Sequence, residues 1–373
     1  MSTEQYYPGL EGVIAGETAV STIAGGLSYR GYSIDDLSAD ATFGEVAYLL
    51  LHGELPNEEQ LADFKAILDE SATLDPSLVE FLKAIPLHVG AMDVLRTGIS
   101  ALAHFDPQLD EQTTAANVGK AMRLLAQIPL LIAARHRQRQ GLPLLDPDPG
   151  LSFAGNLLYL ITGKAPSPLQ ERAMDVSLIL YAEHEFNAST FTARVVTSTQ
   201  ADLYSAVVAA VGALKGPLHG GANERVLEIL EEVESPSRAE GWVRQALAEK
   251  RRIMGFGHRV YKDGDPRAVL LKDYCARLAA EAGDASLEQI AETIERVVRD
   301  EKGLPPNLDW PSARLYHYLG LEVDLYTPLF VASRITGWCA HVIEQSENNR
   351  LIRPRSRYIG PPHREFVPLD ERG

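Results

Sequence analysis

Residues 113–140, TTAANVGKAMRLLAQIPLLIAARHRQRQ, decide the fold class of this chain. Val118, Met122 and Leu125 recur at intervals of three or four residues, which is the spacing that places side chains on one face of an α-helix. The segment ends in three arginines and is followed by Gly141, and cations before a glycine are typical of a helix C-terminus. The segment therefore predicts one long helix with an inward apolar face.

The same periodicity continues along most of the chain. Thr42 and Glu45 form a predicted capping box at the start of one helix, and Asn57 precedes another. Only residues 19–30 differ, because two short apolar stretches there flank Ala24-Gly25-Gly26 and predict a small hairpin. Further helices are predicted at residues 152–162, 167–182, 201–214, 222–234, 237–252, 266–282, 286–302 and 325–350. The pattern has no strand–helix alternation, so we predict an all-α fold with a small N-terminal β-hairpin.

Composition narrows the function classes. The 373 residues carry 35 Lys and Arg against 51 Asp and Glu, a formal charge of −16, and this acidic balance disfavours a general nucleic-acid binder. The two cysteines are too few for a disulfide framework, and the ten dispersed histidines do not suggest a metal site. No apolar run is long enough to span a membrane, and no secretory signal is visible. We expect a cytoplasmic protein.

Two breaks rich in glycine and proline interrupt the helices, KGPLHGG at residues 215–221 and GLPPN at residues 303–307. Both carry unusual polar residues, and such loops on a helical scaffold are where function tends to sit. They bracket a segment that we expect to form a second, smaller helical unit.

Two polar residues in or beside these breaks are candidates for acid–base chemistry. His219 precedes a helix whose N-terminus would keep its imidazole neutral and able to donate to a developing oxyanion. Asp309 follows two prolines and precedes Trp310, an apolar neighbour that would raise the pKa of the carboxyl towards that of a base. In both cases the local sequence leaves open that the side chain merely caps a helix.

Two further candidates lie in one segment. His258 ends Gly255-Phe256-Gly257-His258, where two glycines allow a ligand to approach the backbone closely; the alternative is a flexible loop with a surface histidine. Arg267 begins the helix after Asp265 and is suited to a bidentate contact with a carboxylate, although an arginine in a first turn is otherwise ordinary.

The C-terminal third of the chain carries unusual arginines. Arg334 lies in an apolar segment, and a buried arginine needs a carboxylate or phosphate partner that its sequence neighbours do not provide. Residues 350–357 hold four arginines in a proline-containing stretch that favours a specific anion site over a solvated tail. Together, these histidines, the aspartate and the arginines suit proton removal next to a carbonyl on a polyanionic substrate.

At this point the motifs resemble those of the citrate synthase family. The resemblance covers nearly the whole chain, and several separate motifs in the correct order make it specific. They are GLEGVIAGETAVSTI (9–23), LSYRGYSIDDL (27–37), EHEFNASTF (183–191), GPLHGGANE (216–224), GFGHRVYKDGDPR (255–267), PNLDW (306–310) and NRLIRPRSRYIGP (349–361).

The resemblance implies a helical homodimer with two domains that close on substrate. The large domain would comprise residues 1–219 and 317–373, and the small domain residues 220–316. It also implies the reaction of acetyl-CoA, oxaloacetate and water to give citrate and CoA, with no metal and no cofactor. Asp309 would remove the methyl proton, neutral His219 would hydrogen-bond the enolate, and His258 would polarise the oxaloacetate carbonyl and protonate the alkoxide.

Binding residues follow from the same resemblance. In the family pattern, Arg267, Arg334 and Arg353 bind the carboxylates of oxaloacetate. His184 matches another oxaloacetate ligand, although on its own it would be taken for a core histidine. Arg353 resembles an arginine that reaches the partner subunit's site. The CoA arm would lie against Gly255, Phe256 and Gly257, with Lys262 near a CoA phosphate.

Some questions stay open at this level. The close alternative is 2-methylcitrate synthase, which uses propionyl-CoA and shares these motifs, and dual activity is compatible with them. One methylene separates the acyl groups, a difference worth roughly 1–3 kcal/mol in an apolar pocket.

Trp310 and Pro311 depart from many family members and are expected to alter the wall beside the acyl group. The chain starts close to the GLEG motif, so we expect none of the NADH inhibition of longer bacterial forms. A helical protein that only binds an anion or RNA is the alternative of another class.

Overall fold

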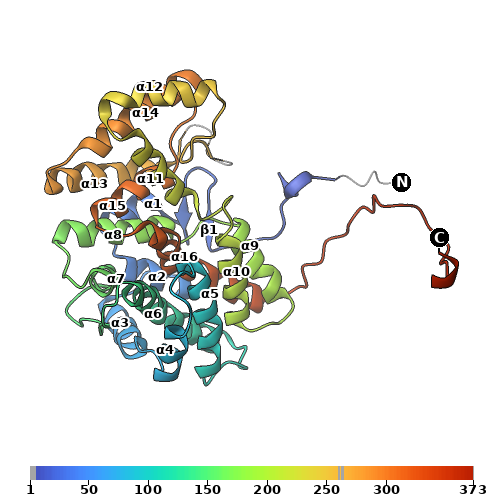
Figure 1. The fold of residues 1–373 in the computed structure, drawn as a ribbon. Helices are drawn as coiled ribbons and strands as arrows, with labels where there is room; N and C mark the ends of the chain where they lie inside the picture. Colours follow the sequence, from blue (N-terminus) through green and yellow to red (C-terminus); the bar gives the residue numbers. More distant parts are fainter. Residues whose placement is uncertain (1–5, 259–260, 262–263, 373) are drawn as a thin grey trace.

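The computed structural model describes residues 6–258, 261 and 264–372. Their architecture is helical around one small sheet (Figure 1), as predicted. The helices are α1 (Ile34–Asp40), α2 (Phe43–His52), α3 (Glu58–Ser71), α4 (Pro76–Lys83), α5 (Ala91–Leu102), α6 (Thr114–Arg139), α7 (Phe153–Thr162), α8 (Pro168–Tyr181), α9 (Ala188–Ser198), α10 (Leu203–Leu214), α11 (Ala222–Val233), α12 (Pro236–Ala248), α13 (Pro266–Ala282), α14 (Ser286–Lys302), α15 (Asp309–Tyr318) and α16 (Tyr326–Glu347).

Local sequence signals account for many of these boundaries. Thr42 and Glu45 form the predicted capping box of α2, and Asn57 caps α3. The predictions for residues 266–282 and 286–302 match α13 and α14. The prediction for residues 237–252 was too long, because α12 ends at Ala248, and the helix predicted to reach residue 350 ends at Glu347.

The predicted hairpin is part of a slightly larger sheet. Strands β1 (Ser21–Thr22), β2 (Ser28–Tyr29) and β3 (Tyr32–Ser33) form an antiparallel sheet in that order, with Ser21 opposite Tyr29 and Tyr29 opposite Tyr32. The third strand is only two residues long, too short for an alternating pattern to reveal it.

Helix α16 forms the centre of the core and is buried along almost its whole length. It packs against α2, α5, α6, α8, α9, α10 and α11. Helices α11 to α15 form a group at the top of the molecule in Figure 1, in which α12 packs on α14 and α13 packs on α15. None of the helices in the described part of the chain is long and apolar enough to cross a membrane.

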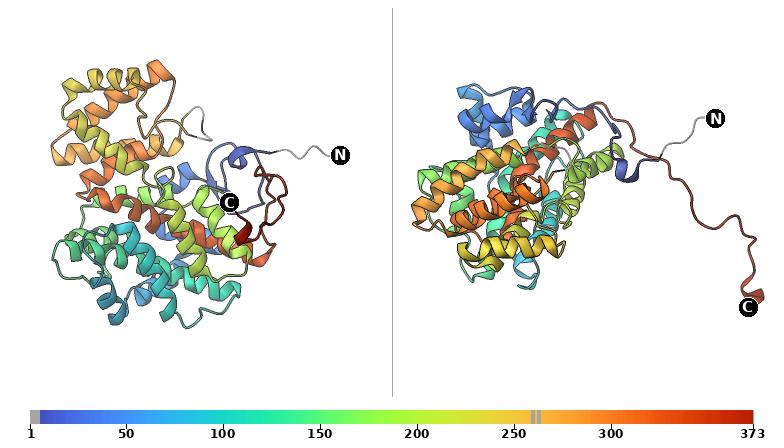
Figure 2. Two further views of the ribbon diagram at one scale, coloured as in Figure 1. Left: turned by 45° about the vertical axis from the view of Figure 1, so that its right-hand side comes forward. Right: turned by 90° about the horizontal axis from the view of Figure 1, so that it is seen from above.

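Both ends of the chain leave the globular body on the same side as extended arms (Figures 1 and 2). The guanidinium carbon of Arg357 in the C-terminal arm lies 5.6 Å from the ring centre of Tyr6 in the N-terminal arm. Large apolar side chains on both arms are exposed, including Ile14 at 90% and Ile359 at 91%. The arms therefore present apolar surface that the rest of this chain does not cover.

Candidate active site

The predicted site residues come from five separate places in the chain. His184 follows α8, His219 lies in the turn between α10 and α11, His258 precedes α13, Asp309 begins α15, and Arg334 lies within α16. Two aromatic side chains join them. The Tyr181 hydroxyl contacts Asp309, and the Phe330 ring centre lies 6.1 Å from that of His219 and 4.6 Å from the Arg334 guanidinium carbon. The fold therefore gathers these residues around one point.

His219 does not cap α11, whose N-cap is Gly221 without a side-chain bond, so the capping alternative is wrong. Its Nε2 instead lies 3.3 Å from the backbone N and 2.8 Å from the Oγ of Ser189, in the first turn of α9. Because a backbone amide only donates, Nε2 must carry the lone pair and the ring proton is on Nδ1. Burial, and then the nearby Arg334, lower the pKa of His219 to about 4. The ring is thus a neutral donor at neutral pH, and the helix that sets its tautomer is α9 rather than α11.

Asp309 is likewise no N-cap. The N-cap position of α15 is Leu308, and the Asp309 carboxylate accepts a 2.9 Å hydrogen bond from the Tyr181 hydroxyl. Its backbone N–H is satisfied by the Asn307 side chain at 3.1 Å. Burial raises the pKa of Asp309 to about 6, opposed by the Tyr181 bond and by the positive charge of Arg267. The carboxylate is therefore ionised at neutral pH yet basic enough to accept a proton.

This pKa predicts the pH dependence of turnover. If ionised Asp309 is the base, kcat should be level above pH 7 and fall about tenfold per pH unit well below pH 6, because the protonated carboxyl cannot accept a proton. The measurement is kcat at saturating substrates between pH 4.5 and 8.5. A decline centred near pH 4 would mean that Asp309 titrates like an ordinary surface carboxyl.

The loops that carry His258 and Asp309 are fastened together. The Gly257 N–H donates to the Pro305 carbonyl at 2.8 Å, and the Asn307 N–H donates to the Gly255 carbonyl at 2.8 Å. The Asn307 side chain adds a 2.9 Å bond to the Gly257 carbonyl. These backbone contacts fix the predicted CoA-binding loop, Gly255 to Gly257, directly beside the start of α15.

Trp310 supports this loop from inside the core. It is fully buried, its indole N–H donates to Glu295 at 2.9 Å, and its ring centre lies 4.6 Å from that of Phe256. The contacts of Trp310 with the site are therefore made through the Gly255–Gly257 loop, and the expectation that Trp310 and Pro311 alter the wall beside the acyl group stays a prediction.

Both the backbone conformation at residue 255 and the atoms around it require a glycine. Its φ is +85°, and a Cβ there would lie 2.9 Å from a Trp310 ring atom and 2.9 Å from Val226. Gly255→Ala should lower both thermal stability and kcat. The control is Gly283→Ala, which has a similar φ of +71° but open space around its Cβ. Thermal unfolding and thiol-release assays of both variants check this, and equal losses would show that crowding at residue 255 is unimportant.

His258 and His184 lie next to each other, with ring centres 5.2 Å apart. The Tyr261 N–H donates to His258 Nδ1 at 3.2 Å, which in the neutral ring leaves the proton on Nε2. His184 Nε2 contacts the Tyr261 hydroxyl at 3.1 Å. Burial, with repulsion from Arg267 and Arg334, holds the pKa of His184 well below its usual range. His184 is therefore neutral at neutral pH, and Tyr261 contacts both rings.

The buried arginines have different partners. Arg267 is paired with Asp265 through Nε and Nη2 at 2.9 and 2.8 Å, and Asp265 also accepts the Leu308 N–H at 3.0 Å. Arg334 donates from Nε to the Tyr181 carbonyl at 2.6 Å. Among the described residues no carboxylate forms a direct ion pair with it, although the buried Glu183 acts on it electrostatically. Burial lowers the pKa of Arg334 to about 10, which leaves it charged at neutral pH and suited to an anionic ligand.

Two predicted residues do not join this cluster. Arg353 is exposed on the C-terminal arm, which extends away from the body (Figure 1). Lys262 lies outside the described residues.

Several residues that hold the site together were not singled out from the sequence. Tyr181, Ser189 and Tyr261 contact Asp309, His219 and His184 respectively, and Asp265 holds Arg267. Only Asp265 had a usable signal, because Asp-Pro at a helix start is a common cap. The contacts of the other three join segments far apart in the sequence, which periodicity does not reveal.

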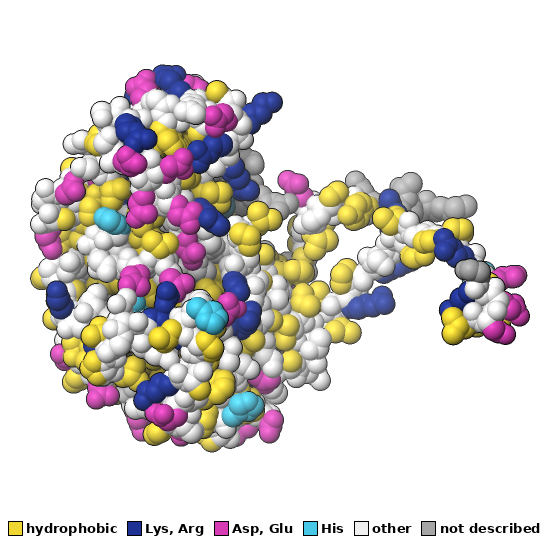
Figure 3. Space-filling model, in the orientation of Figure 1, with side chains coloured by type: hydrophobic (Ala, Val, Ile, Leu, Met, Phe, Trp, Pro, Cys, Tyr) yellow, Lys and Arg dark blue, Asp and Glu magenta, His cyan; other side chains and the backbone are white. Residues whose placement is uncertain are grey.

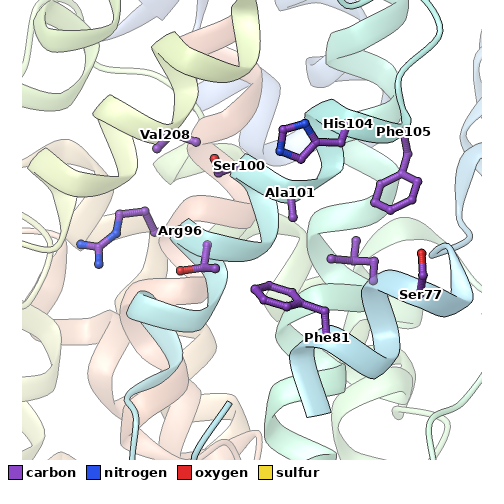
Figure 4. Close-up of a pocket in the computed structure, with 10 residues that line it drawn as sticks. Ser77, Phe81, Arg96, Ser100, Ala101, His104, Phe105 and Val208 are labelled. Carbon is purple, nitrogen blue, oxygen red and sulfur yellow. The ribbon is translucent and has the colours of Figure 1, made fainter. Parts of the chain in front are cut away.

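Two other features of the described residues were compared with this cluster. A cavity of about 570 Å³ lies between α4, α5 and α10 (Figure 4), and no predicted site residue lines it. Within the described ranges, no group of three or more histidine, cysteine or acidic side chains could hold a metal ion.

Fold and site together describe a helical protein in which a carboxylate with a raised pKa, neutral imidazoles and buried cations lie in one cluster. The sequence model of the protein family described as citrate synthase, C-terminal domain, matches residues 9–355 of this chain. Citrate synthase 2 of Bacillus subtilis is 48% identical over 98% of both chains, and 2-methylcitrate synthase 2 of Corynebacterium glutamicum is 44% identical over 100% of this chain and 99% of that one. A citrate synthase from Thermoplasma acidophilum, solved with carboxymethyl coenzyme A and oxaloacetate, superposes with a TM-score of 0.93 at 34% identity over 99% of this chain and 100% of that one.

The chain belongs to the citrate synthase family. It is accordingly an acyltransferase, and the family resemblance inferred from its motifs is confirmed.

Proposed function

We propose that this protein condenses acetyl-CoA with oxaloacetate and hydrolyses the resulting thioester to citrate and CoA, with propionyl-CoA as the alternative acyl donor. One observation carries the proposal: an ionised Asp309 with a raised pKa lies in the same cluster as neutral His219 and the buried, charged Arg334. A base, an oxyanion donor and a carboxylate-binding cation are what enolisation beside a dicarboxylate requires.

The proposed steps balance through side chains of this chain. Asp309 takes the proton from the thioester methyl group, and the Nδ1–H of His219 donates a hydrogen bond to the enolate oxygen. The enolate carbon attacks the oxaloacetate carbonyl, and the Nε2–H of His258 donates to that oxygen and transfers its proton to the new alkoxide. Water then adds to the thioester carbonyl, its oxygen ends in the new carboxylate, and CoA leaves. Of its two protons and the one held by Asp309, one returns to His258, one protonates the CoA thiolate and one is released to solvent. These steps use no cofactor beyond the two substrates and water.

Oxaloacetate binding is assigned to His184, Arg267, Arg334 and the arm residue Arg353, and CoA binding to the loop Gly255–Gly257 and to Lys262. Arg267 would exchange part of its contact with Asp265 for a substrate carboxylate.

We also propose that residues 220–316 form a small domain that closes on the rest. His258, Arg267 and Asp309 come from this segment, whereas His184, His219 and Arg334 come from outside it. The two sets already lie together in this structure, where the His184 and His258 ring centres are 5.2 Å apart. The proposed movement would open the site to admit the substrates and close it again to exclude water before enolisation.

The proposed assembly is a homodimer in which each C-terminal arm reaches the other subunit's site. The arms carry exposed apolar side chains together with arginines (Figure 3), a combination suited to covering a second protein surface that contains an anionic site. A cytoplasmic location is supported by the two free, buried cysteines, which suit a reducing compartment.

The deciding experiment is thiol release from acetyl-CoA and from propionyl-CoA, each with and without oxaloacetate. Oxaloacetate-dependent release that favours acetyl-CoA supports the proposal. A clear preference for propionyl-CoA would assign the protein to 2-methylcitrate synthesis, and comparable rates would indicate dual specificity. No release from either would leave a protein that only binds its ligand.

A further inference from the structure

Tyr181 connects the Asp309 carboxylate to the rest of the core. It is the last residue of α8 and is buried, with its ring centre 4.5 Å from that of Phe330. Its hydroxyl lies 2.9 Å from Asp309 Oδ1 and 2.7 Å from Ser312 Oγ. One phenol thus bonds to the first residue of α15 and to the residue one turn later.

The backbone of Tyr181 is also fixed by the site. Its carbonyl accepts the 2.6 Å bond from Arg334 Nε, so the residue that holds Asp309 is itself held by a predicted oxaloacetate ligand. One turn earlier on α8, Ser177 bonds to the Tyr316 hydroxyl at 2.9 Å, which fastens the same two helices a second time. The Tyr181 hydroxyl therefore has little freedom to move away from Asp309.

In the hydrogen bond between Tyr181 and Asp309, the phenol is the donor and the carboxylate is the acceptor. Burial and the nearby Asp309 charge raise the pKa of Tyr181 well above its usual value, so the phenol stays protonated and donates. A carboxylate that accepts such a bond on one oxygen keeps the other for a substrate proton, and the bond favours its ionised form. Among the described residues, Asp309 Oδ2 has no hydrogen-bond donor.

We infer that Tyr181 is the positioning residue of the catalytic base: its hydroxyl holds Asp309 Oδ1, which leaves Oδ2 to take the proton from the acyl thioester. This inference rests on the proposed function, since it assumes that Asp309 is the base. Tyr181 itself neither gains nor loses a proton in the reaction.

The test variant is Tyr181→Phe, which removes one oxygen and keeps the ring against Phe330. We expect kcat to fall about tenfold and the acidic decline of kcat to move up by about one pH unit, while KM for oxaloacetate stays within about twofold. The charged groups that act electrostatically on Asp309 remain in place, namely Arg267, Asp265 and Arg334.

The matched control is Tyr316→Phe, which removes a buried hydroxyl from the same α8–α15 contact without touching Asp309. It should leave the acidic decline where it is in the unaltered enzyme. An unchanged pH profile in Tyr181→Phe, or an equal shift in Tyr316→Phe, would overturn the inference. If Tyr181→Phe does not fold, Ser312→Ala, which weakens the phenol as a donor, should give a smaller shift in the same direction, and no shift would overturn it.

An infrared titration separates this inference from the proposed function. The carboxyl band that is present in the unaltered protein but absent from Asp309→Asn belongs to Asp309 and should titrate near pH 6. The same difference, taken between Tyr181→Phe and the double variant Tyr181→Phe/Asp309→Asn, should titrate near pH 7. This readout needs no turnover. Absent thiol release would therefore overturn the function alone, and an unmoved band would overturn the role of Tyr181 alone.

Discussion

Asp309→Asn should lower kcat by about 10³-fold or more while leaving oxaloacetate affinity nearly unchanged, since removal of a general base costs on the order of 10²–10⁴ in rate. The amide has almost the shape of the carboxyl but cannot accept the methyl proton. It can still pair with the Tyr181 hydroxyl, so the packing around α15 should survive. Steady-state thiol release and calorimetric titration with oxaloacetate measure the two quantities.

The control is Asp284→Asn, which changes an exposed carboxylate that accepts the Ser286 N–H at the start of α14. It should leave kcat unaltered. Turnover of Asp309→Asn close to that of the unaltered enzyme would refute the role of Asp309 as base. Loss of oxaloacetate binding would instead show that the substitution disturbs Arg334 or Arg267.

Mixed dimers test whether Arg353 serves the other subunit. Arg353→Ala and Asp309→Asn homodimers should each be nearly inactive. After subunit exchange at equal concentrations, about half of the dimers should be mixed, and one of their two sites should combine intact Asp309 with the partner's intact Arg353. Activity should then recover to about a quarter of that of the unaltered enzyme.

The same mixture distinguishes an arm that serves the partner subunit's site from an arm that serves the site of its own chain. If Arg353 serves the site of its own chain, every site in a mixed dimer lacks one essential residue and activity stays at the level of the parents. If Arg353→Ala alone keeps full activity, the arm does not supply a substrate ligand at all. Size-exclusion chromatography with light scattering confirms that both parents remain dimers, and a monomer would contradict the proposed assembly.

The sequence predicted most of the helices because their signals are local. Caps such as Thr42 with Glu45, apolar spacing and terminal glycines depend on residues within a few positions of one another. It missed α1, α4, α5 and α9. The sequence of α9, ASTFTARVVTS, is rich in β-branched residues that disfavour a helix. Packing between α10 and α16 overrides that preference.

For the site, the sequence motifs alone identified the candidate residues and the family to which the chain belongs. They left both His219 and Asp309 ambiguous between catalysis and helix capping. Tertiary structure removed the capping alternative, since Gly221 and Leu308 occupy the N-cap positions. It also supplied the partners of both side chains: Ser189 sets the tautomer of His219 and Tyr181 bonds to Asp309, from positions 30 and 128 residues away along the chain. The pKa of a side chain and the position of its proton depend on burial and on such distant partners, which only the folded chain brings together.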